Sequence, residues 1–485
     1  MVARIFGRER EIEKLQRLLR SENPEFLAIY GRRRVGKTYL IQEFFKDKGT
    51  FFSFTGTRNG TKRSQIQKFY RVLKQKFEIS HTEKPPTSWD DALFTLQEAV
   101  GKIDPSKKVI LFFDELPWLA SKCSGFLEAL EYFWNQYLSQ ARNVILIVCG
   151  SAANWIIKKI INNKGGLYGR LTEVIKLNAF TLDESMKFLQ SQGVTLSHKL
   201  VAELYMCFGG VAKYLTYVHP GESAAQSINR LCFISQGPLV PEFTNLYYSL
   251  FDSPSKHIEI VRALAAKKGG VSKLELYEKL NMPTGGQSTA ILEELEESGF
   301  IAINPEFQKK AKNKRLWLVD EYSYFYLSWI EEVKSGVLMG HDSEYWLKMQ
   351  SEPRWKTWAG YAFESLCFKH IPQIKKALGI SALLTTESQW AYKPKDKSEI
   401  GVQIDLLLDR KDDCINIFEI KFCNSLFAIT KSYAKEIEAK IRVFREVTKT
   451  TKTIFITFIT PFGLQKNEYS TELIHNELVL EDLFC

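Results

Sequence analysis

FLAIYGRRRVGKTYLIQEFF, residues 26–45, is the stretch that decides the fold of the first half of this 485-residue chain. Its central segment, GRRRVGKT at 31–38, fits the pattern GxxxxGK[ST] in full. A short apolar run precedes this segment and a helical pattern follows it, which is the context that a phosphate-binding loop requires. We therefore predict a nucleotide-binding loop made of Gly31, Arg32, Arg33, Arg34, Val35, Gly36, Lys37 and Thr38.

The residue types in this loop suit the binding of a nucleotide triphosphate. Glycines let backbone N–H groups turn toward the phosphates, and the N-terminus of the following helix adds positive potential. Lys37 would place its charge on the β- and γ-phosphates, and Thr38 would offer its hydroxyl to magnesium. ATP and Mg²⁺ are therefore the expected cofactors.

Two acids follow the next long apolar run. The run VILFF at 109–113 leads directly into Asp114 and Glu115. At the exposed tip of a strand beside the loop, Asp114 would hold the water shell of magnesium. Glu115 would then polarise the attacking water as a catalytic base.

Ser151 and Arg170 each have two alternative interpretations. Ser151 ends the run VILIVCGS at 144–151, so it would either contact the γ-phosphate or position water, or else cap the helix that follows. Arg170 precedes a strand pattern, so it would either act as an arginine finger or pair with a surface acid. A finger that reached another copy of the chain would require self-association. The residues alone leave both pairs of alternatives open.

Apolar strand-like runs alternate with helical patterns through the first part of the chain. Such alternation predicts an α/β fold with a parallel sheet that helices cover on both faces. A P-loop ATPase core is expected at 1–180 and a helical lid at 181–250. The strand-like runs lie at 26–31, 50–56, 108–116, 144–151 and 174–180.

Residues 251–335 show three helical patterns and a hairpin, a succession that resembles a winged helix. The candidate recognition helix, 287–298, is acidic, whereas the loop KKAKNKR at 309–315 is basic. Because phosphates repel glutamates, DNA binding and a packing role between domains both stay open for this unit. The last predicted domain, 350–485, follows a boundary expected around 335–355. It contains a helix at 358–371, strands at 402–408 and 414–420, a helix near 431–447 and a strand at 453–460.

The last domain carries a second group of chemically active residues. Asp405 lies in the apolar strand pattern IDLLL, and Glu419 and Lys421 lie two apart in IFEIKF. Glu364 lies on the preceding helix. Unpaired charges inside apolar strands are costly, so these side chains would form either a divalent-cation site or a structural salt-bridge cluster. In the first case Glu364, Asp405 and Glu419 would bind magnesium, while Lys421 would position the nucleophile.

Composition is that of an ordinary globular protein, with 45% hydrophobic and 25% charged residues. No apolar stretch reaches the roughly 18 residues of a membrane span, and a cytoplasmic location without a membrane partner is expected. The net charge of +10 permits contact with DNA or RNA. The eight cysteines form no CxxC pair, so reduced thiols are expected rather than disulfides or zinc ligands.

The N-terminal half resembles the archaeal-type ATPases, a family similar to the AAA+ and STAND ATPases. The resemblance rests on IFGRERE at 5–11, GRRRVGKT at 31–38 and FFDEL at 112–116. It implies that Gly7 and Arg8 border the adenine and that Ser151 is a sensor. It also implies that the glycines at 209–210 form the turn of the lid, although Ala212 stands where the family usually has proline.

The order Glu364, Asp405, Glu419-x-Lys421 resembles the PD-(D/E)XK nuclease superfamily over roughly residues 355–465. The domain that commonly follows archaeal-type ATPases shows the same pattern. The resemblance implies a magnesium-dependent nuclease-like domain.

Two functional hypotheses follow. The first is an ATPase coupled to cleavage of DNA or RNA. The second is a STAND-like regulatory switch whose C-terminal domain binds a partner or nucleic acid without cutting it.

Overall fold

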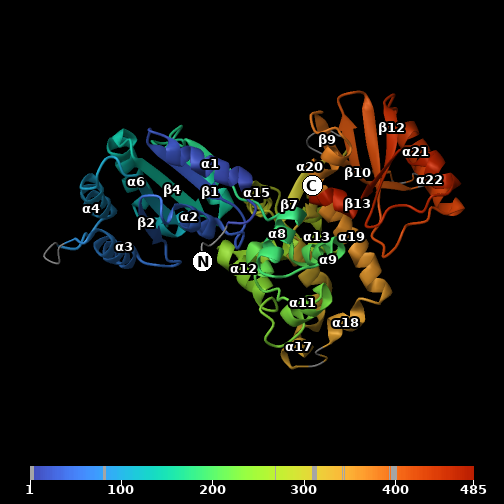
Figure 1. Cartoon of the computed structure of the whole chain (residues 1–485), viewed down its shortest axis with the longest axis horizontal. Helices are drawn as coiled ribbons and strands as arrows, with labels where there is room; N and C mark the ends of the chain where they lie inside the picture. Colours follow the sequence, from blue (N-terminus) through green and yellow to red (C-terminus); the bar gives the residue numbers. More distant parts are fainter. Residues whose placement is uncertain are drawn as a thin grey trace. The chain divides into compact units, whose positions relative to one another are not determined.

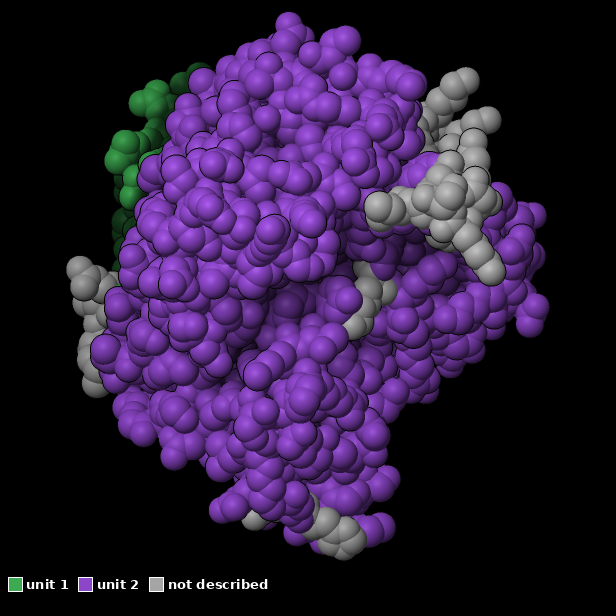
Figure 2. Space-filling view, turned by 90° about the vertical axis from the view of Figure 1, so that its right-hand side faces the viewer, with its two compact units in different colours: residues 1–179 green, residues 180–485 purple. Residues whose placement is uncertain are grey.

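A computed structural model describes residues 5–485, except 80–83, 268, 309–313, 341, 343, 393 and 395–400. The chain divides into two compact units, Met1–Ala179 and Phe180–Cys485. Figure 2 colours these units separately. Each unit is described by itself below.

Unit 1 is built on a five-stranded sheet with the order β2-β3-β4-β1-β5, in which all neighbouring pairs are parallel. Alternate residues of β3 face two different apolar cores: Ile110 and Phe112 face one, and Leu111 and Phe113 the other. The predicted parallel sheet with both faces covered is therefore confirmed, and Figure 1 shows its helices around the strands. The strands are β1 (Glu25–Tyr30), β2 (Thr50–Thr55), β3 (Val109–Asp114), β4 (Val144–Gly150) and β5 (Glu173–Lys176).

Two of the helices of unit 1, α3 and α4, begin at residues whose side chains cap them. Ser88 accepts a hydrogen bond from the backbone N–H of Asp91 and so caps α4. Thr61 does the same for α3 through the N–H of Ser64. The helices are α1 (Glu9–Arg20), α2 (Lys37–Phe45), α3 (Lys62–Phe77), α4 (Trp89–Gly101), α5 (Leu116–Leu119), α6 (Phe126–Gln136) and α7 (Ala153–Ile156).

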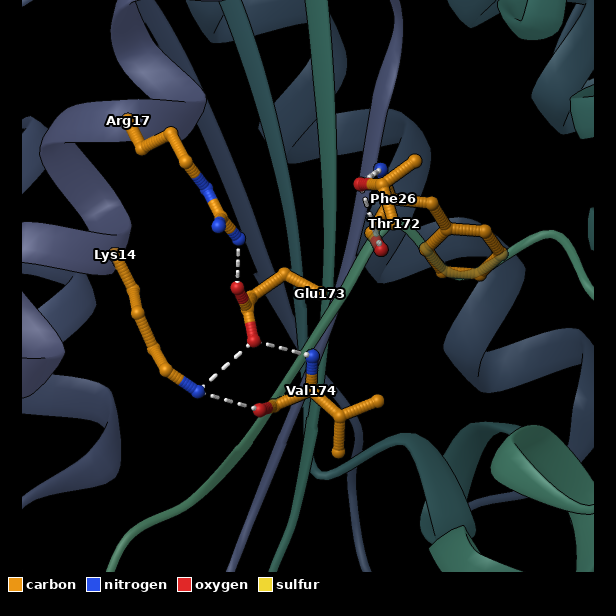
Figure 3. Close-up of polar contacts among 6 residues, drawn as sticks. All are labelled: Lys14, Arg17, Phe26, Thr172, Glu173 and Val174. Atoms are coloured by element: carbon orange, nitrogen blue, oxygen red, sulfur yellow. Dashed lines mark hydrogen bonds and ion pairs between the residues drawn. The ribbon is translucent and has the colours of Figure 1, made fainter.

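A polar cluster joins α1 to the edge strand β5, as Figure 3 shows. Glu173, whose side chain is 11% exposed, accepts hydrogen bonds from Arg17 and, at 2.9 Å, from Lys14. Lys14 also donates to the carbonyl of Val174 at 3.3 Å. Exposed ion pairs of this kind are individually weak, but two of them share one mostly buried carboxylate. They hold α1 against the sheet, and with it the segment that leads from Gly7 into α1.

Unit 2 begins with the helical segment predicted at 181–250. It continues with a three-stranded antiparallel sheet of order β6-β8-β7, which three helices accompany. The first helices are α8 (Leu182–Ser191), α9 (His198–Phe208), α10 (Ala212–Leu215), α11 (Ala224–Cys232) and α12 (Glu242–Leu250). The next elements are α13 (Pro254–Ala265), β6 (Val271–Ser272), α14 (Lys273–Lys279), α15 (Gly286–Glu297), β7 (Ile301–Pro305) and β8 (Lys314–Leu318).

The C-terminal part of unit 2 contains a five-stranded sheet of order β13-β12-β11-β10-β9. It is mixed, because β9, β10 and β11 are antiparallel while β12 and β13 run parallel to β11. The strands are β9 (Thr385–Tyr392), β10 (Val402–Arg410), β11 (Cys414–Ile420), β12 (Thr453–Thr460) and β13 (Asn476–Val479). The helices that precede and flank it are α16 (Glu321–Phe325), α17 (Glu331–Leu338), α18 (Tyr345–Met349), α19 (Pro353–Lys369), α20 (Ile371–Ala377), α21 (Lys431–Thr448) and α22 (Glu468–Leu473).

One apolar core runs through much of unit 2. It includes Phe208 of α9, Trp346 of α18 and Phe363 of α19. Trp346 is fully buried and packs against Trp329 and Trp355 with ring centroids 5.3 and 5.2 Å apart. The segment around 335–355 is therefore tied into the core through its tryptophan.

His370, which follows α19, links this helix to the start of α8. Its Nε2 accepts a hydrogen bond from the N–H of Leu182 at 3.0 Å, and its Nδ1 lies 2.8 Å from the carbonyl of Leu366. The first contact requires an unprotonated Nε2, so Nδ1 carries the proton and donates. Burial lowers the pKa of His370 to about 4, from an ordinary value of 6.5. The histidine is neutral in the folded chain.

This histidine predicts acid-sensitive stability. As the pH falls from 6.5 toward 4, the unfolded chain takes up a proton that the folded chain excludes. The free energy of unfolding should therefore fall by up to about 3 kcal/mol over that window. Urea unfolding at several pH values measures this slope. His370→Gln should flatten the slope, whereas His219→Gln, at an exposed histidine, should leave it unchanged; equal slopes in both variants would contradict the assignment.

Candidate functional site

The loop at 31–38 connects β1 to α2, and its backbone conformation depends on glycine. Gly31 has φ 146°, and a Cβ there would lie 2.2 Å from the carbonyl oxygen of Leu177. Gly36, with φ 98°, immediately precedes α2, and a Cβ there would meet no atom within 4 Å. The loop is thus packed against the sheet on one side and has open space at the helix N-terminus, where backbone N–H groups attract anions.

Lys37 is held inside the loop and is only 5% exposed. Its Nζ donates to the carbonyl oxygens of Gly31 at 2.9 Å and Arg32 at 3.0 Å. Burial lowers the pKa of Lys37, while the nearby Glu115 and Asp114 carboxylates act in the opposite direction. The structure therefore places the lysine charge between the loop and the two acids.

Thr38 and Asp114 are in direct contact. The Oγ1 of Thr38 donates to Oδ2 of Asp114 at 2.8 Å, although 76 residues separate them in the chain. Asp114 ends β3 and is 4% exposed, and its other oxygen accepts the backbone N–H of Glu115 at 3.0 Å. The hydroxyl and carboxylate that the sequence assigned to magnesium are thus neighbours.

Glu115 lies in a strained backbone conformation, with φ 48°. Such left-handed conformations in residues other than glycine cost energy and cluster at functional sites. Its carboxylate accepts hydrogen bonds from the hydroxyl of Ser151 at 2.7 Å and from the Ser151 N–H at 3.2 Å. The interpretation of Ser151 as a helix cap is wrong, because the residue at the start of α7 is Ala152 and the Ser151 hydroxyl is engaged by Glu115.

Arg8, which the family resemblance places beside the adenine, and Arg170, the candidate arginine finger, lie in different environments. Arg8 is buried, has φ 65° and donates to the carbonyl of Val35 at 3.2 Å, so the segment at 7–8 contacts the loop. Arg170 is exposed and forms no ion pair with a residue that the structure describes. The proposed pairing of Arg170 with a surface acid is therefore absent from the described part of the chain.

Cys149 is a residue of this site that the sequence did not indicate. It precedes Gly150 at the end of β4, is fully buried, and its pKa is raised first by burial and then by the charge of Asp114. The sequence signal that could have identified Cys149 is its position one residue before the end of the apolar run that forms β4. All eight cysteines are free thiols, as expected.

The second group of predicted residues lies in the C-terminal sheet of unit 2. A β-bulge interrupts the pairing of β10 with β9 between Ile404 and Leu407, so Asp405 and Leu406 stand opposite Gln389 alone. Bulges of this kind redirect side chains and are frequent beside active sites. Asp405 and Glu364 of α19 line the same pocket.

Burial raises the pKa of Asp405, and the charge of Glu419 on the paired strand β11 raises it further. A hydrogen bond from Nε2 of Gln403, at 2.6 Å, acts in the opposite direction. The carboxylate is thus in a position where a bound cation would stabilise its charge.

Glu419 and Lys421 lie together on the side of the sheet that α21 covers. Glu419 is 4% exposed, accepts a hydrogen bond from the hydroxyl of Tyr433 at 2.7 Å and forms an ion pair with Lys440. The Nζ of Lys421 lies 5.6 Å from the centre of the Tyr433 ring. The prediction that these two residues share a face agrees with this arrangement.

The structure does not gather Glu364, Asp405 and Glu419 into one three-carboxylate cluster. Among the residues that it describes, no group of three or more His, Cys, Asp or Glu side chains is arranged to hold a metal ion. The physical reason is that Glu419 points to the Tyr433 and Lys440 side chains of α21, whereas Glu364 and Asp405 line the pocket beside α19. Asp405 nevertheless lies near enough to Glu419 for the charge of Glu419 to raise its pKa.

The middle part of unit 2 is described only in part. The acidic helix expected at 287–298 is α15, while most of the basic loop at 309–315 lies outside the described residues. Arg315, at the end of that loop, forms an ion pair with Glu306 and donates to the carbonyl of Gly270 at 3.0 Å. Arg315 therefore has its partners within the folded chain.

No described helix is both long and apolar enough to cross a membrane.

The sheet order, the loop at 31–38 and the paired acids define a P-loop nucleotide-binding protein. Residues 5–218 match the model of an ATPase domain found predominantly in Archaea. The chain therefore carries an archaeal-type ATPase domain, as the sequence predicted.

Two proteins of Methanocaldococcus jannaschii are similar to this chain. One, an uncharacterized protein, is 23% identical over 421 residues, which are 86% of this chain and 87% of that protein. The other, an uncharacterized ATP-binding protein, is 22% identical over 362 residues, which are 65% of this chain and 98% of that protein. Among solved structures, a Walker-type ATPase of Pyrococcus abyssi matches with a TM-score of 0.50 and 22% identity, covering 67% of this chain and 96% of that one. That similarity concerns the fold.

Proposed function

We propose that this chain binds ATP with magnesium at the loop 31–38 and hydrolyses it. The observation that carries the proposal is the contact between Thr38 and Asp114 at 2.8 Å, next to the buried Nζ of Lys37. The space beside Gly36 is open on the side where a Cβ would lie, since such an atom meets no residue outside its immediate chain neighbours within 4 Å. Thr38 and Asp114 would hold Mg²⁺, which supplies charge neutralisation.

In this proposal Glu115 positions and activates the attacking water. Its strained backbone and its two hydrogen bonds from Ser151 fix the carboxylate beside Asp114. Ser151 thereby acts through Glu115 as a sensor, while Gly7 and Arg8 border the adenine. The exposed Arg170 is available as an arginine finger toward a second copy of the chain.

Glu115→Gln should leave ATP binding intact and slow hydrolysis by roughly 100-fold, because the amide keeps the shape of the side chain but is no base. Steady-state phosphate release and binding of a fluorescent ATP analogue measure the two effects. Glu128→Gln, at an exposed glutamate of α6, is the matched control. Unchanged hydrolysis in Glu115→Gln would remove Glu115 from this role.

We further propose that residues 350–485 form a nuclease-like domain that cleaves DNA or RNA with magnesium. The bulge that brings Asp405 into one pocket with Glu364 carries this proposal. The order of α19, the antiparallel strands β9 to β11, α21 and the parallel strand β12 supports it. The chain would then have four domains: an ATPase core at 1–180, a helical lid at 181–250, a winged-helix-like unit at 251–335 and the nuclease-like domain at 350–485.

The carboxylates of this site are ligands of the type that Mg²⁺ prefers. Asp405 is largely buried, and its raised pKa reflects the cost of an uncompensated charge. Asp405, with Glu364 or Glu419, would hold Mg²⁺, which supplies Lewis-acid chemistry at the phosphate. Lys421 would position the nucleophile.

A regulatory switch is the second candidate function, and one observation favours it. Both oxygens of Glu419 already have partners within the fold, Tyr433 and Lys440. A satisfied carboxylate of this kind suits a structural role in a domain that binds a partner without cutting it. Cleavage assays with Asp405→Asn, argued in the Discussion, separate the two functions.

A further inference from the structure

The strained turn that carries Glu115 is short and closely packed. Glu115, at φ 48° and ψ 50°, lies between the end of β3 and the four-residue helix α5. Its carbonyl oxygen accepts the N–H of Trp118 at 2.9 Å. The same oxygen lies close to Gly56, because a Cβ at that glycine would be 2.7 Å from it. The segment that follows β2 therefore packs directly against the backbone of this turn.

Gln65, on α3, joins these two segments through its side-chain amide, which is buried with the residue only 1% exposed. Its Oε1 accepts the backbone N–H of Thr57 at 3.0 Å, and its Nε2 donates to the carbonyl of Trp118 at 2.8 Å. Nε2 also donates to the carbonyl of Gly60 at 3.4 Å. One buried side chain thus connects the loop after β2 with the end of the turn after β3.

An amide suits both of these bonds. The N–H of Thr57 needs an acceptor and the carbonyl of Trp118 needs a donor, and a glutamine side chain carries both. The helix itself is anchored without this amide, because Thr61 caps α3 and Phe69 is buried in the apolar core beneath it. Loss of the amide should therefore act mainly on the two loop segments and not on α3.

We propose that Gln65 is a positioning residue for ATP hydrolysis, which holds the turn of Glu115 so that the carboxylate stays where it meets Ser151 and the attacking water. The inference rests on the proposed hydrolysis of ATP and adds a residue that no motif marks. Gln65 acts through the Trp118 carbonyl and not on the nucleotide. Because a misplacement of about 1 Å can cost roughly 100-fold in rate, a loosened turn lowers the rate of hydrolysis and leaves nucleotide affinity in place.

Gln65→Met removes the amide and nearly keeps the length of the side chain. In the full-length chain it should lower the single-turnover rate of ATP hydrolysis roughly tenfold, while the affinity for a fluorescent ATP analogue stays within about twofold. Gln67→Met is the matched control, because Gln67 lies on the same helix and is exposed, and its rate should equal that of the natural protein. If Gln65→Met does not fold, Gln65→Glu gives the same comparison, since it keeps an acceptor for Thr57 and loses the donor to Trp118.

A double-mutant cycle with Glu115→Gln separates positioning from a general loss of stability. If Gln65 acts through Glu115, adding Gln65→Met to the Glu115→Gln protein should cause no further loss of rate, since the two residues act as one unit. A further loss of roughly tenfold in that protein would overturn the inference, because independent effects add. A natural rate of hydrolysis, or a loss of nucleotide binding, in the folded Gln65→Met protein would also overturn it.

These outcomes leave the proposed ATP hydrolysis intact, because each of them is measured against a natural protein that turns ATP over. The absence of hydrolysis in the natural protein would overturn both the proposed function and the role of Gln65.

Discussion

Lys37→Ala is expected to abolish ATP turnover, with a loss of roughly 100-fold or more in the rate of phosphate release. Lys37 is a buried cation of the loop, and its Nζ lies against the carbonyls of Gly31 and Arg32 beside the acids Asp114 and Glu115. Without it, the charge that develops on the β- and γ-phosphates loses its main counter-charge. A coupled assay of phosphate release measures the effect.

Lys46→Ala is the matched control for this experiment. Lys46 follows α2, the helix that Lys37 begins, and it forms an exposed ion pair with Glu43 at 2.7 Å. Its loss should leave turnover unchanged, since exposed pairs of this kind contribute little. Circular dichroism of both variants establishes that they are folded. Turnover that survives in a folded Lys37→Ala protein would remove the loop from the proposed site.

Asp405→Asn is expected to abolish magnesium-dependent cleavage, by roughly 100-fold or more. The bulge between Ile404 and Leu407 aims this carboxylate into the pocket that Glu364 also lines. The amide keeps the size of the side chain and removes the charge that a divalent cation needs. Because burial raises the pKa of Asp405, the uncharged variant should be no less stable than the natural protein.

The control for Asp405→Asn lies in the same hairpin. Asp412, in the turn between β10 and β11, forms an ion pair with Arg410, and Asp412→Asn should leave cleavage intact. ATP turnover should be retained in both variants. If the natural protein cuts no nucleic acid under any condition while its ATP hydrolysis is intact, the regulatory switch becomes the better function. Cleavage that persists in Asp405→Asn would assign the activity to other residues.

Much of the fold could be predicted because it is encoded in local patterns. The run at 109–113 is apolar without interruption, and the run at 453–460 alternates apolar residues with threonines; they form β3 and β12 at nearly the predicted residues. The helix expected near 431–447 is α21, Lys431–Thr448. In each case the period of apolar residues directly reflects which sides of the element are buried.

The candidate sites could be predicted less completely. The sequence indicated Ser151, but it left two roles open, and only the structure shows the hydroxyl bound to Glu115. It gave no indication of Cys149, nor of Tyr433 and Lys440 as the partners of Glu419. These contacts join segments that are distant in the chain, and periodicity carries no information about them.

The sequence by itself determined the nucleotide loop, because a motif of eight consecutive residues, 31–38, contains both the glycines and the charged groups that phosphate binding needs. Only the tertiary structure decided which side chains Glu364, Asp405 and Glu419 meet. A bulge in β10 turns Asp405 toward the pocket shared with Glu364, while the packing of α21 gives Glu419 its own partners. The physical reason is that a strand fixes the alternation of its side chains, whereas strand pairing and helix packing decide what each of them meets.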